Sequence, residues 1–309
     1  MTSRRQTRRQ NSTRRRDRAV RLALARHRVL SFRQLRRLVF PELTAQRVGQ
    51  HLHRLAVNGW LRIWEDASQL GGRPRYALLT RRALAVALDE LRAERPEQST
   101  AHLASIMLPR SPRRPLRFTA RVTPAFLPHQ RECNDLLIAF AEMPGVRLLW
   151  ATALDRPFPL RAAGIALPQP DYVLVLEHGG RASLVFGEHD RGHESLAHFR
   201  AAKAERYAAL AARPELAREL FGFATFRVWV TVLDARSGAP LRRLARLVHV
   251  ARAAAASDVM AFTLAGWAAS TPAAPIWFCD GAAPESELHD QAKATPGLHA
   301  LPTHPPLHP

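Results

Sequence analysis

Three acidic residues lie at the ends of two apolar segments in the middle of the sequence. Asp171 opens the first segment, DYVLVLEH, and Glu188 and Asp190 close the second, ASLVFGEHD. A His-Gly-Gly sequence at 178–180 separates the segments, which predicts a β-hairpin. Because side chains alternate along a strand, we expect Glu188 and Asp190 on one face and His189 on the other. Antiparallel pairing would also bring Asp171 next to the end of the second strand.

A lysine follows the hairpin at helical spacing. The segment from Glu194 to Ala212 predicts a helix whose inner stripe contains Leu196, Phe199, Lys203, Tyr207 and Leu210. An inward ammonium requires a counter-charge, which the neighbouring carboxylates would supply. Of the 46 basic residues only Lys203 and Lys293 are lysine. Lysine is a compact charge with a pKa that shifts readily, so its presence here favours a chemical role.

Converging carboxylates repel one another unless a cation or a proton joins them. The order Asp, Glu-x-Asp and inward lysine resembles a variant of the PD-(D/E)xK nuclease site. In the usual site the lysine stands two residues after the glutamate, where this chain has Asp190. We expect Asp171, Glu188 and Asp190 to bind Mg²⁺ or Mn²⁺ and to form a catalytic site with Lys203. A charged hairpin rim without a chemical role is the alternative.

Residues 17–91 have the pattern of a winged helix-turn-helix. Asp17, Ser31 and Thr44 are positioned to cap three helices, and a hairpin around residues 69–73 follows. The third helix has a predicted buried stripe of Ala45, Val48, Leu52, Leu55 and Ala56. Arginine and glutamine on its outer face are suited to reading bases in the major groove. The predicted DNA-binding residues are Arg47, Gln50, His51 and Arg54 on the helix and Arg73 and Arg75 on the hairpin. A winged helix that binds protein is the alternative.

The other segments complete the predicted domain plan. Residues 1–16 predict a disordered basic arm, 92–128 a proline-rich basic linker, and 281–309 a disordered tail. Residues 129–280 follow the order helix, three strands, helix, strand, which is that of restriction-endonuclease-like domains. The predicted fold class is therefore an α+β winged helix-turn-helix followed by an α/β restriction-endonuclease-like domain of PD-(D/E)xK type. A Rossmann fold is not expected, because no glycine-rich strand-to-helix turn is present.

Composition indicates the partner and the compartment. The formal net charge is +20, which predicts a polyanion such as double-stranded DNA. No run of 18 apolar residues and no signal-peptide core are present, so we expect a cytoplasmic protein without a membrane partner. Cys133 and Cys279 lie far apart without metal-ligand spacing, and the histidines match no zinc pattern.

Several motifs together resemble a known family. The segments HQRECNDLL, PDYVLVL and EHDRGHESL, followed by Lys203 and Tyr207, resemble the replication-relaxation family of bacterial mobile elements. They are also similar to the MOBC class of plasmid relaxases, whose catalytic domains resemble restriction endonucleases. The resemblance covers most of residues 17–234. It implies that Asp171, Glu188 and Asp190 bind a divalent metal and that Lys203 assists phosphodiester cleavage. His189 stands where the family usually has an aliphatic residue.

Two functions remain open from the sequence. The first is a DNA-binding protein of a plasmid or mobile element, acting in replication or mobilisation, with metal-dependent DNA nicking. The second is a non-catalytic replication or mobilisation accessory factor, or a transcriptional regulator, that only binds DNA. Either could act with other relaxosome or replication proteins.

Overall fold

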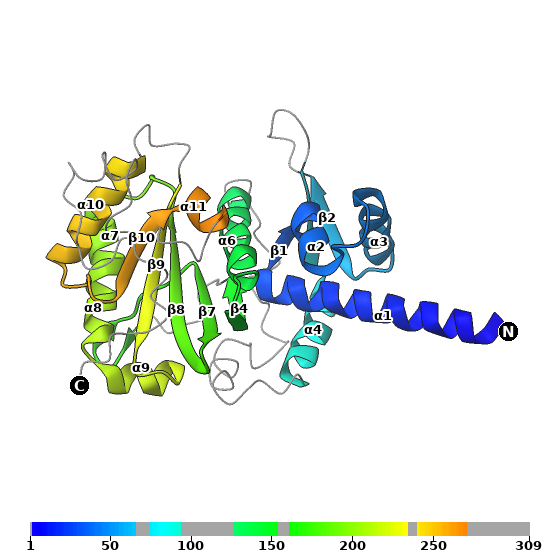
Figure 1. Ribbon diagram of the computed structural model, residues 1–309, viewed down its shortest axis with the longest axis horizontal. Helices are drawn as coiled ribbons and strands as arrows, with labels where there is room; N and C mark the ends of the chain where they lie inside the picture. The colour runs from blue at the N-terminus through cyan, green and yellow to red at the C-terminus, as the bar shows by residue number, and fades with distance from the viewer. Residues whose placement is uncertain (1, 66–73, 94–125, 154–160, 234–239, 271–309) are drawn as a thin grey trace. The chain divides into compact units, whose positions relative to one another are not determined.

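The computed structural model describes residues 2–65, 74–93, 126–153, 161–233 and 240–270 (Figure 1). They divide into two compact units, the first comprising described residues up to 93 and 126–134, and the second residues 135–270. Each unit combines helices with a sheet, so the mixed α and β character predicted from the sequence is confirmed. Within the described ranges no helix is both long and apolar enough to cross a membrane.

The first unit is built from helices around a small antiparallel sheet of order β1-β3-β2. Ser31 caps α2 in a capping box with Gln34, and Thr44 caps α3 by accepting a hydrogen bond from the Arg47 N–H. Both caps were predicted from the sequence. The elements are α1 (Thr2–His27), β1 (Val29–Ser31), α2 (Phe32–Val39), α3 (Ala45–Val57), β2 (Leu61–Glu65), β3 (Arg75–Leu79) and α4 (Arg81–Ala93).

Helix α1 begins fifteen residues earlier than the sequence predicts. The expected start was Asp17, whereas the helix runs from Thr2 to His27. The prediction that residues 2–16 are disordered is therefore wrong. Thr2–His27 contains neither glycine nor proline, and its many arginines and glutamines favour helix, so high charge did not prevent helix formation.

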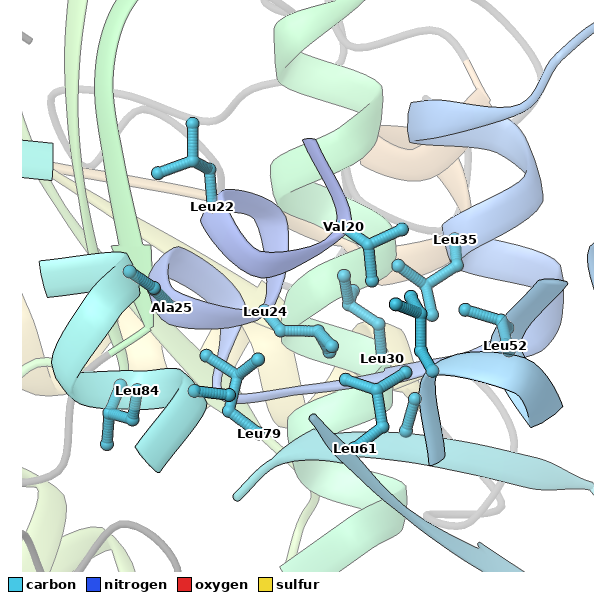
Figure 2. Packing of buried hydrophobic residues seen from close by; sticks show 14 of the residues in the cluster. Val20, Leu22, Leu24, Ala25, Leu30, Leu35, Leu52, Leu61, Leu79 and Leu84 are labelled. Atoms are coloured by element: carbon cyan, nitrogen blue, oxygen red, sulfur yellow. The ribbon is translucent and has the colours of Figure 1, made fainter. Parts of the chain in front are cut away.

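A leucine-rich core holds the first unit together (Figure 2). Leu24 of α1, Leu52 of α3 and Leu79 of β3 are almost completely buried in it. Full burial of one such side chain stabilises the fold by about 1.5 to 3 kcal/mol. Two members of the predicted stripe of α3 differ from the prediction, because Ala45 is exposed and Ala56 is half-buried. The buried stripe of α3 is therefore narrower, consisting of Val48, Leu52 and Leu55.

The second unit has a five-stranded mixed sheet of order β10-β9-β8-β7-β4. Strands β8, β9 and β10 are parallel, while β7 is antiparallel to both β8 and β4. It contains the end of α6 (Phe126–Ala141), from Asp135 onward. Its other elements are β4 (Arg147–Ala153), β5 (Arg161–Ala162), β6 (Ile165–Ala166), β7 (Tyr172–His178), β8 (Arg181–Asp190), α7 (Leu196–Phe199), a π-helical turn (Arg200–Ala204), α8 (Glu205–Ala211), α9 (Pro214–Phe221), β9 (Phe226–Val232), α10 (Pro240–Ala253), β10 (Met260–Leu264) and α11 (Ala265–Ser270).

The predicted hairpin is confirmed as β7 and β8. Gly179 and Gly180 both have positive φ, 56° and 77°, as a tight two-residue hairpin turn requires. Near the other end of the hairpin Tyr172 pairs with Gly187. A Cβ at Gly187 would lie 1.9 Å from the Tyr172 ring, so glycine allows this ring to pack against β8 immediately before Glu188.

The boundary between the units lies within α6 rather than at its start. The sequence predicts a second domain from residue 129, but the helix up to Asn134 belongs to the first unit. The Asn134 amide donates to the Val29 carbonyl at 2.6 Å, and the Gln34 amide donates to the Arg131 carbonyl at 2.9 Å. The predicted linker, except for its ends, and the predicted tail lie outside the described residues.

Candidate functional site

The end of β8 places alternate side chains on opposite faces of the sheet. Glu188 contacts Tyr207 of α8, whereas the His189 Nδ1 lies 3.0 Å from the Thr231 hydroxyl of β9. Asp190 contacts Arg243 of α10. Strand alternation therefore puts Glu188 and Asp190 on the face covered by α8 and α10, with His189 on the other face. This arrangement was predicted from the sequence and is confirmed.

Lys203 points into the protein, as predicted. It lies in the π-helical turn between α7 and α8, and its Nζ is 2.7 Å from Glu188 Oε2 and 3.5 Å from Glu194 Oε2. Only 17% of its side chain is exposed. The Tyr207 hydroxyl donates to Glu188 Oε1 at 2.6 Å. Two side chains four residues apart thus engage both oxygens of one buried carboxylate, at a kind of helical irregularity often found in functional sites.

Burial and neighbouring charges shift the pKa values of this group. Burial raises the pKa of Glu188 to about 7, with Asp171 adding to the increase and Lys203 opposing it. Burial alone would lower the pKa of Lys203, but Glu188, Asp171 and Glu194 outweigh it and raise that pKa above its ordinary value. Burial next to Glu188 also raises the pKa of Tyr207. Lys203 therefore remains an ammonium near neutral pH, and Tyr207 remains a hydroxyl that can donate.

Asp171 closes the open end of the hairpin. Its N–H donates to the Gly187 carbonyl at 2.9 Å, and its Oδ2 accepts a hydrogen bond from the His189 N–H at 2.8 Å. Its charge contributes to the raised pKa values of both Glu188 and Lys203. Asp171, Glu188 and Lys203 therefore form one electrostatic cluster, as the sequence predicts.

Asp190 has a counter-charge that was not predicted from the sequence. Its Oδ2 accepts from Arg243 Nε at 2.7 Å and its Oδ1 from the same guanidinium at 3.2 Å, a bidentate pair. The guanidinium also donates to the Glu194 carbonyl at 2.7 Å. The sequence contained a signal for this role, because Arg243 is four residues before the buried Leu247 and lies beside the inner stripe of α10.

The carboxylates have suitable chemistry for Mg²⁺ or Mn²⁺, but in this arrangement their oxygens are already engaged. The two Glu188 oxygens face Tyr207 and Lys203, and both Asp190 oxygens face Arg243. The Glu188 and Asp190 side chains are only 1% and 2% exposed, which leaves little room for the waters that Mg²⁺ usually retains. This conformation therefore does not fit a divalent ion. Binding would require Lys203 to leave Glu188, or Arg243 to leave Asp190, so that the ion could take its place. The metal role remains a prediction.

The predicted DNA-binding residues fall into two groups on α3. Arg47 and Gln50 are exposed, as expected. His51 and Arg54 were expected to project outward, but both are half-buried and contact Asp17 Oδ1 of α1, at 2.9 Å and 2.6 Å. The prediction that both project outward is wrong, because Asp17 lies opposite α3 and supplies a counter-charge.

Three further residues complete the surface around α3. His53 is exposed, and the sequence reasoning missed it although it follows Gln50 at helical spacing. The Arg75 guanidinium is 4.7 Å from the centre of the Phe32 ring, a cation–π contact within the first unit. Arg73 lies outside the described residues.

Comparison with known proteins identifies the family. No curated protein and no solved structure matches the chain significantly. The family model described as replication-relaxation matches residues 22–221, which is more than half of the chain. The match includes α3, Asp171, Glu188, Asp190 and Lys203. The chain therefore belongs to the replication-relaxation family.

Proposed function

We propose that this protein binds double-stranded DNA of a plasmid or mobile element through its first unit and acts in replication or mobilisation. The observation that carries the proposal is the exposed face of α3. Val48, Leu52 and Leu55 fix the inner face of this helix in the core, while Arg47 and Gln50 are exposed on the other side. Membership in a family named for replication supports the biological setting.

The order of elements supports a winged helix-turn-helix interpretation. Helices α2 and α3 are capped at Ser31 and Thr44, and β2 and β3 follow as an antiparallel pair. In such modules the second helix of the pair lies in the major groove. Arginine pairs with guanine and glutamine with adenine at base edges, so Arg47 and Gln50 are chemically suited to base reading.

Equilibrium binding to duplex DNA tests the proposal. A labelled duplex is titrated with the full chain at several salt concentrations, and fluorescence anisotropy gives the affinity. Because binding of phosphates by arginine releases counterions, the logarithm of the association constant should fall linearly with the logarithm of salt, by about 0.9 per phosphate neutralised. Absence of duplex binding at low salt would contradict the proposal.

Metal-dependent nicking is a second candidate. The contact between the inward Lys203 and Glu188 favours it, because a lysine beside carboxylates is the arrangement expected of a PD-(D/E)xK-type site. In this candidate Asp171, Glu188 and Asp190 would hold Mg²⁺ or Mn²⁺ once Lys203 or Arg243 had left its carboxylate, and Lys203 would assist cleavage. The compensated charges of Glu188 and Asp190 instead favour the non-catalytic accessory role.

Two measurements separate these candidates. Supercoiled plasmid is incubated with the protein and Mg²⁺, Mn²⁺ or EDTA, with Lys203→Met as the inactive comparison and circular dichroism to establish that this variant is folded at the assay temperature. If the protein nicks DNA, relaxed plasmid should form in the presence of Mg²⁺ or Mn²⁺. No relaxed plasmid should form with EDTA or with Lys203→Met. In parallel, a bound metal should raise the melting temperature of the wild type, and Asp171→Ala should abolish that increase. If no relaxed plasmid forms and metal does not change the melting temperature, the nicking candidate is contradicted and only the DNA-binding role remains.

A further inference from the structure

Helix α10 of the second unit carries a row of exposed basic side chains. Leu244, Leu247, Val248 and Ala251 are buried, and the helix packs on β9, β10 and α7. Its opposite side has four exposed basic residues, which we call the α10 basic stripe: Arg242, Arg246, His249 and Arg252. They are separated by four, three and three residues, so they lie along one side of the helix.

The α10 basic stripe has no internal counter-charge. Pro240–Ala253 contains no acidic residue, and none of the stripe residues has an ion-pair or hydrogen-bond partner among the described residues. Three other exposed arginines of the second unit do have a counter-charge, since Arg147, Arg200 and Arg218 each contact a glutamate. Uncompensated like charges repel, so a surface of this kind is suited to a polyanion.

We propose that the α10 basic stripe binds the phosphate backbone of double-stranded DNA, as a second contact beyond the α3 surface. This inference rests on the proposed duplex binding and extends it to the second unit. From Arg242 to Arg252 the helix rises about 15 Å, and phosphates of one strand recur about every 3.4 Å along the DNA axis, so the stripe can face several of them. Arginine is suited to phosphate by its charge and its bidentate geometry.

The position of α10 relates the stripe to the carboxylate cluster. Arg243, on the inner side of the same helix, contacts Asp190 and the Glu194 carbonyl. Duplex bound on the stripe would therefore lie beside the end of β8. An anionic membrane surface is less suited, because membrane-surface helices insert an apolar face, whereas that face of α10 is buried against the sheet.

Three variants of the full chain test the stripe with a labelled random-sequence duplex. The first replaces Arg242, Arg246 and Arg252 by glutamine. The second, a matched control, removes the same charge from the second unit by replacing Arg147, Arg200 and Arg218 by glutamine. The third places lysine at the three stripe positions, which preserves their charge. Circular dichroism and melting temperature establish that each variant is folded.

The stripe variant should bind duplex at least about tenfold more weakly than wild type. The slope of the logarithm of its association constant against the logarithm of salt concentration should correspond to about two to three fewer phosphate contacts. The affinity of the matched control, here called the paired-arginine control because its three arginines contact glutamates, should remain within about threefold of wild type. The lysine variant should retain the salt dependence of wild type. Equal behaviour of the stripe variant and the control would overturn the inference. So would a stripe-dependent affinity for phosphatidylserine vesicles with unchanged duplex binding.

The same titrations distinguish the two proposals. Absence of duplex binding by the wild type overturns both. Duplex binding that Arg47→Ala weakens, but that the stripe variant leaves at the level of the paired-arginine control, overturns only the stripe.

Discussion

Glu188 is the residue on which the candidate site depends. Its carboxylate is buried, and its charge is compensated by the Lys203 ammonium at 2.7 Å and a hydrogen bond from Tyr207 at 2.6 Å. A buried ion pair contributes little net free energy to folding. Removing one partner is nevertheless strongly destabilising, because it leaves the other charge buried without compensation. The pair is therefore a sensitive point of the fold, whether or not the site is catalytic.

Lys203→Met should lower the free energy of unfolding by about 3 to 5 kcal/mol at pH about 8. The effect should be smaller at acidic pH. Burial already raises the folded-state pKa of Glu188 to about 7, above its ordinary 4.5, and loss of Lys203 would raise it further. A group with a raised folded-state pKa stabilises the fold below its unfolded pKa and loses that contribution as pH rises through the folded value. Denaturant unfolding across this range measures the difference.

The double variant Lys203→Met with Glu188→Gln is the control. A neutral amide needs no counter-charge, so the double variant should recover most of the lost stability. The part of the pH dependence that comes from Glu188 should be absent from it. An equal loss of stability at every pH in the single variant would show that Lys203 contributes packing and not charge compensation.

Local signals in the sequence predicted several helices and the central hairpin. The caps at Ser31 and Thr44, the apolar spacing of α3 and the Gly-Gly turn of the β7–β8 hairpin each depend on a few neighbouring residues, and each is confirmed. Lys203 was predicted to face inward for the same reason, since it falls on the buried stripe of its own segment.

Partners from distant segments were not predictable in this way. Asp17 pairs with Arg54 across 37 residues, and Asp190 pairs with Arg243 across 53 residues. Periodicity shows that a side chain lies on a face but not which other segment covers that face. The predicted free surface of His51 and Arg54, and the predicted need for a metal to balance Asp190, both depended on contacts of this kind.

A buried polar network joins α1, β1 and the first turns of α6. His27 Nδ1 lies 3.3 Å from Asn134 Oδ1, and the Asn134 amide donates to the carbonyls of His27 and Val29. The Gln130 amide donates to the same Asn134 oxygen at 3.2 Å. Burial lowers the pKa of His27 to about 4, so its ring is neutral in the folded protein at neutral pH. In this state Nδ1–H can donate to Asn134.

Acid should weaken the first unit through His27. Its folded-state pKa lies below the ordinary 6.5, so its contribution to stability is present above pH 6.5 and is lost as pH falls toward 4. This pKa shift corresponds to a decrease of up to about 3 kcal/mol in the free energy of unfolding. His27→Gln, which keeps a donor and does not titrate, should unfold with a weaker pH dependence than wild type between these limits. Identical pH dependence in the two proteins would show that His27 is not protonated on unfolding.

The position of the unit boundary affects which experiments can assign DNA binding to one unit. A fragment that begins after residue 91 would keep the segment up to Asn134 but lose the first-unit groups that Asn134 and Arg131 contact. Its behaviour would therefore mix loss of DNA contacts with loss of folding. Point variants in the full chain avoid this problem, and the net charge of +20 makes a charge-matched control necessary.

Recognition of DNA by α3 is tested by the duplex affinity of the full chain carrying both Arg47→Ala and Gln50→Ala, compared with that of the full chain carrying Arg81→Ala. Arg81 is an exposed arginine at the start of α4, so its replacement controls for charge in the first unit. If α3 recognises bases of the duplex, the binding free energy of the combined variant should be weaker than that of wild type by about 1 to 3 kcal/mol. Arg81→Ala should change the binding free energy by less than about 1 kcal/mol. Affinity of the combined variant equal to wild type would contradict DNA recognition by α3.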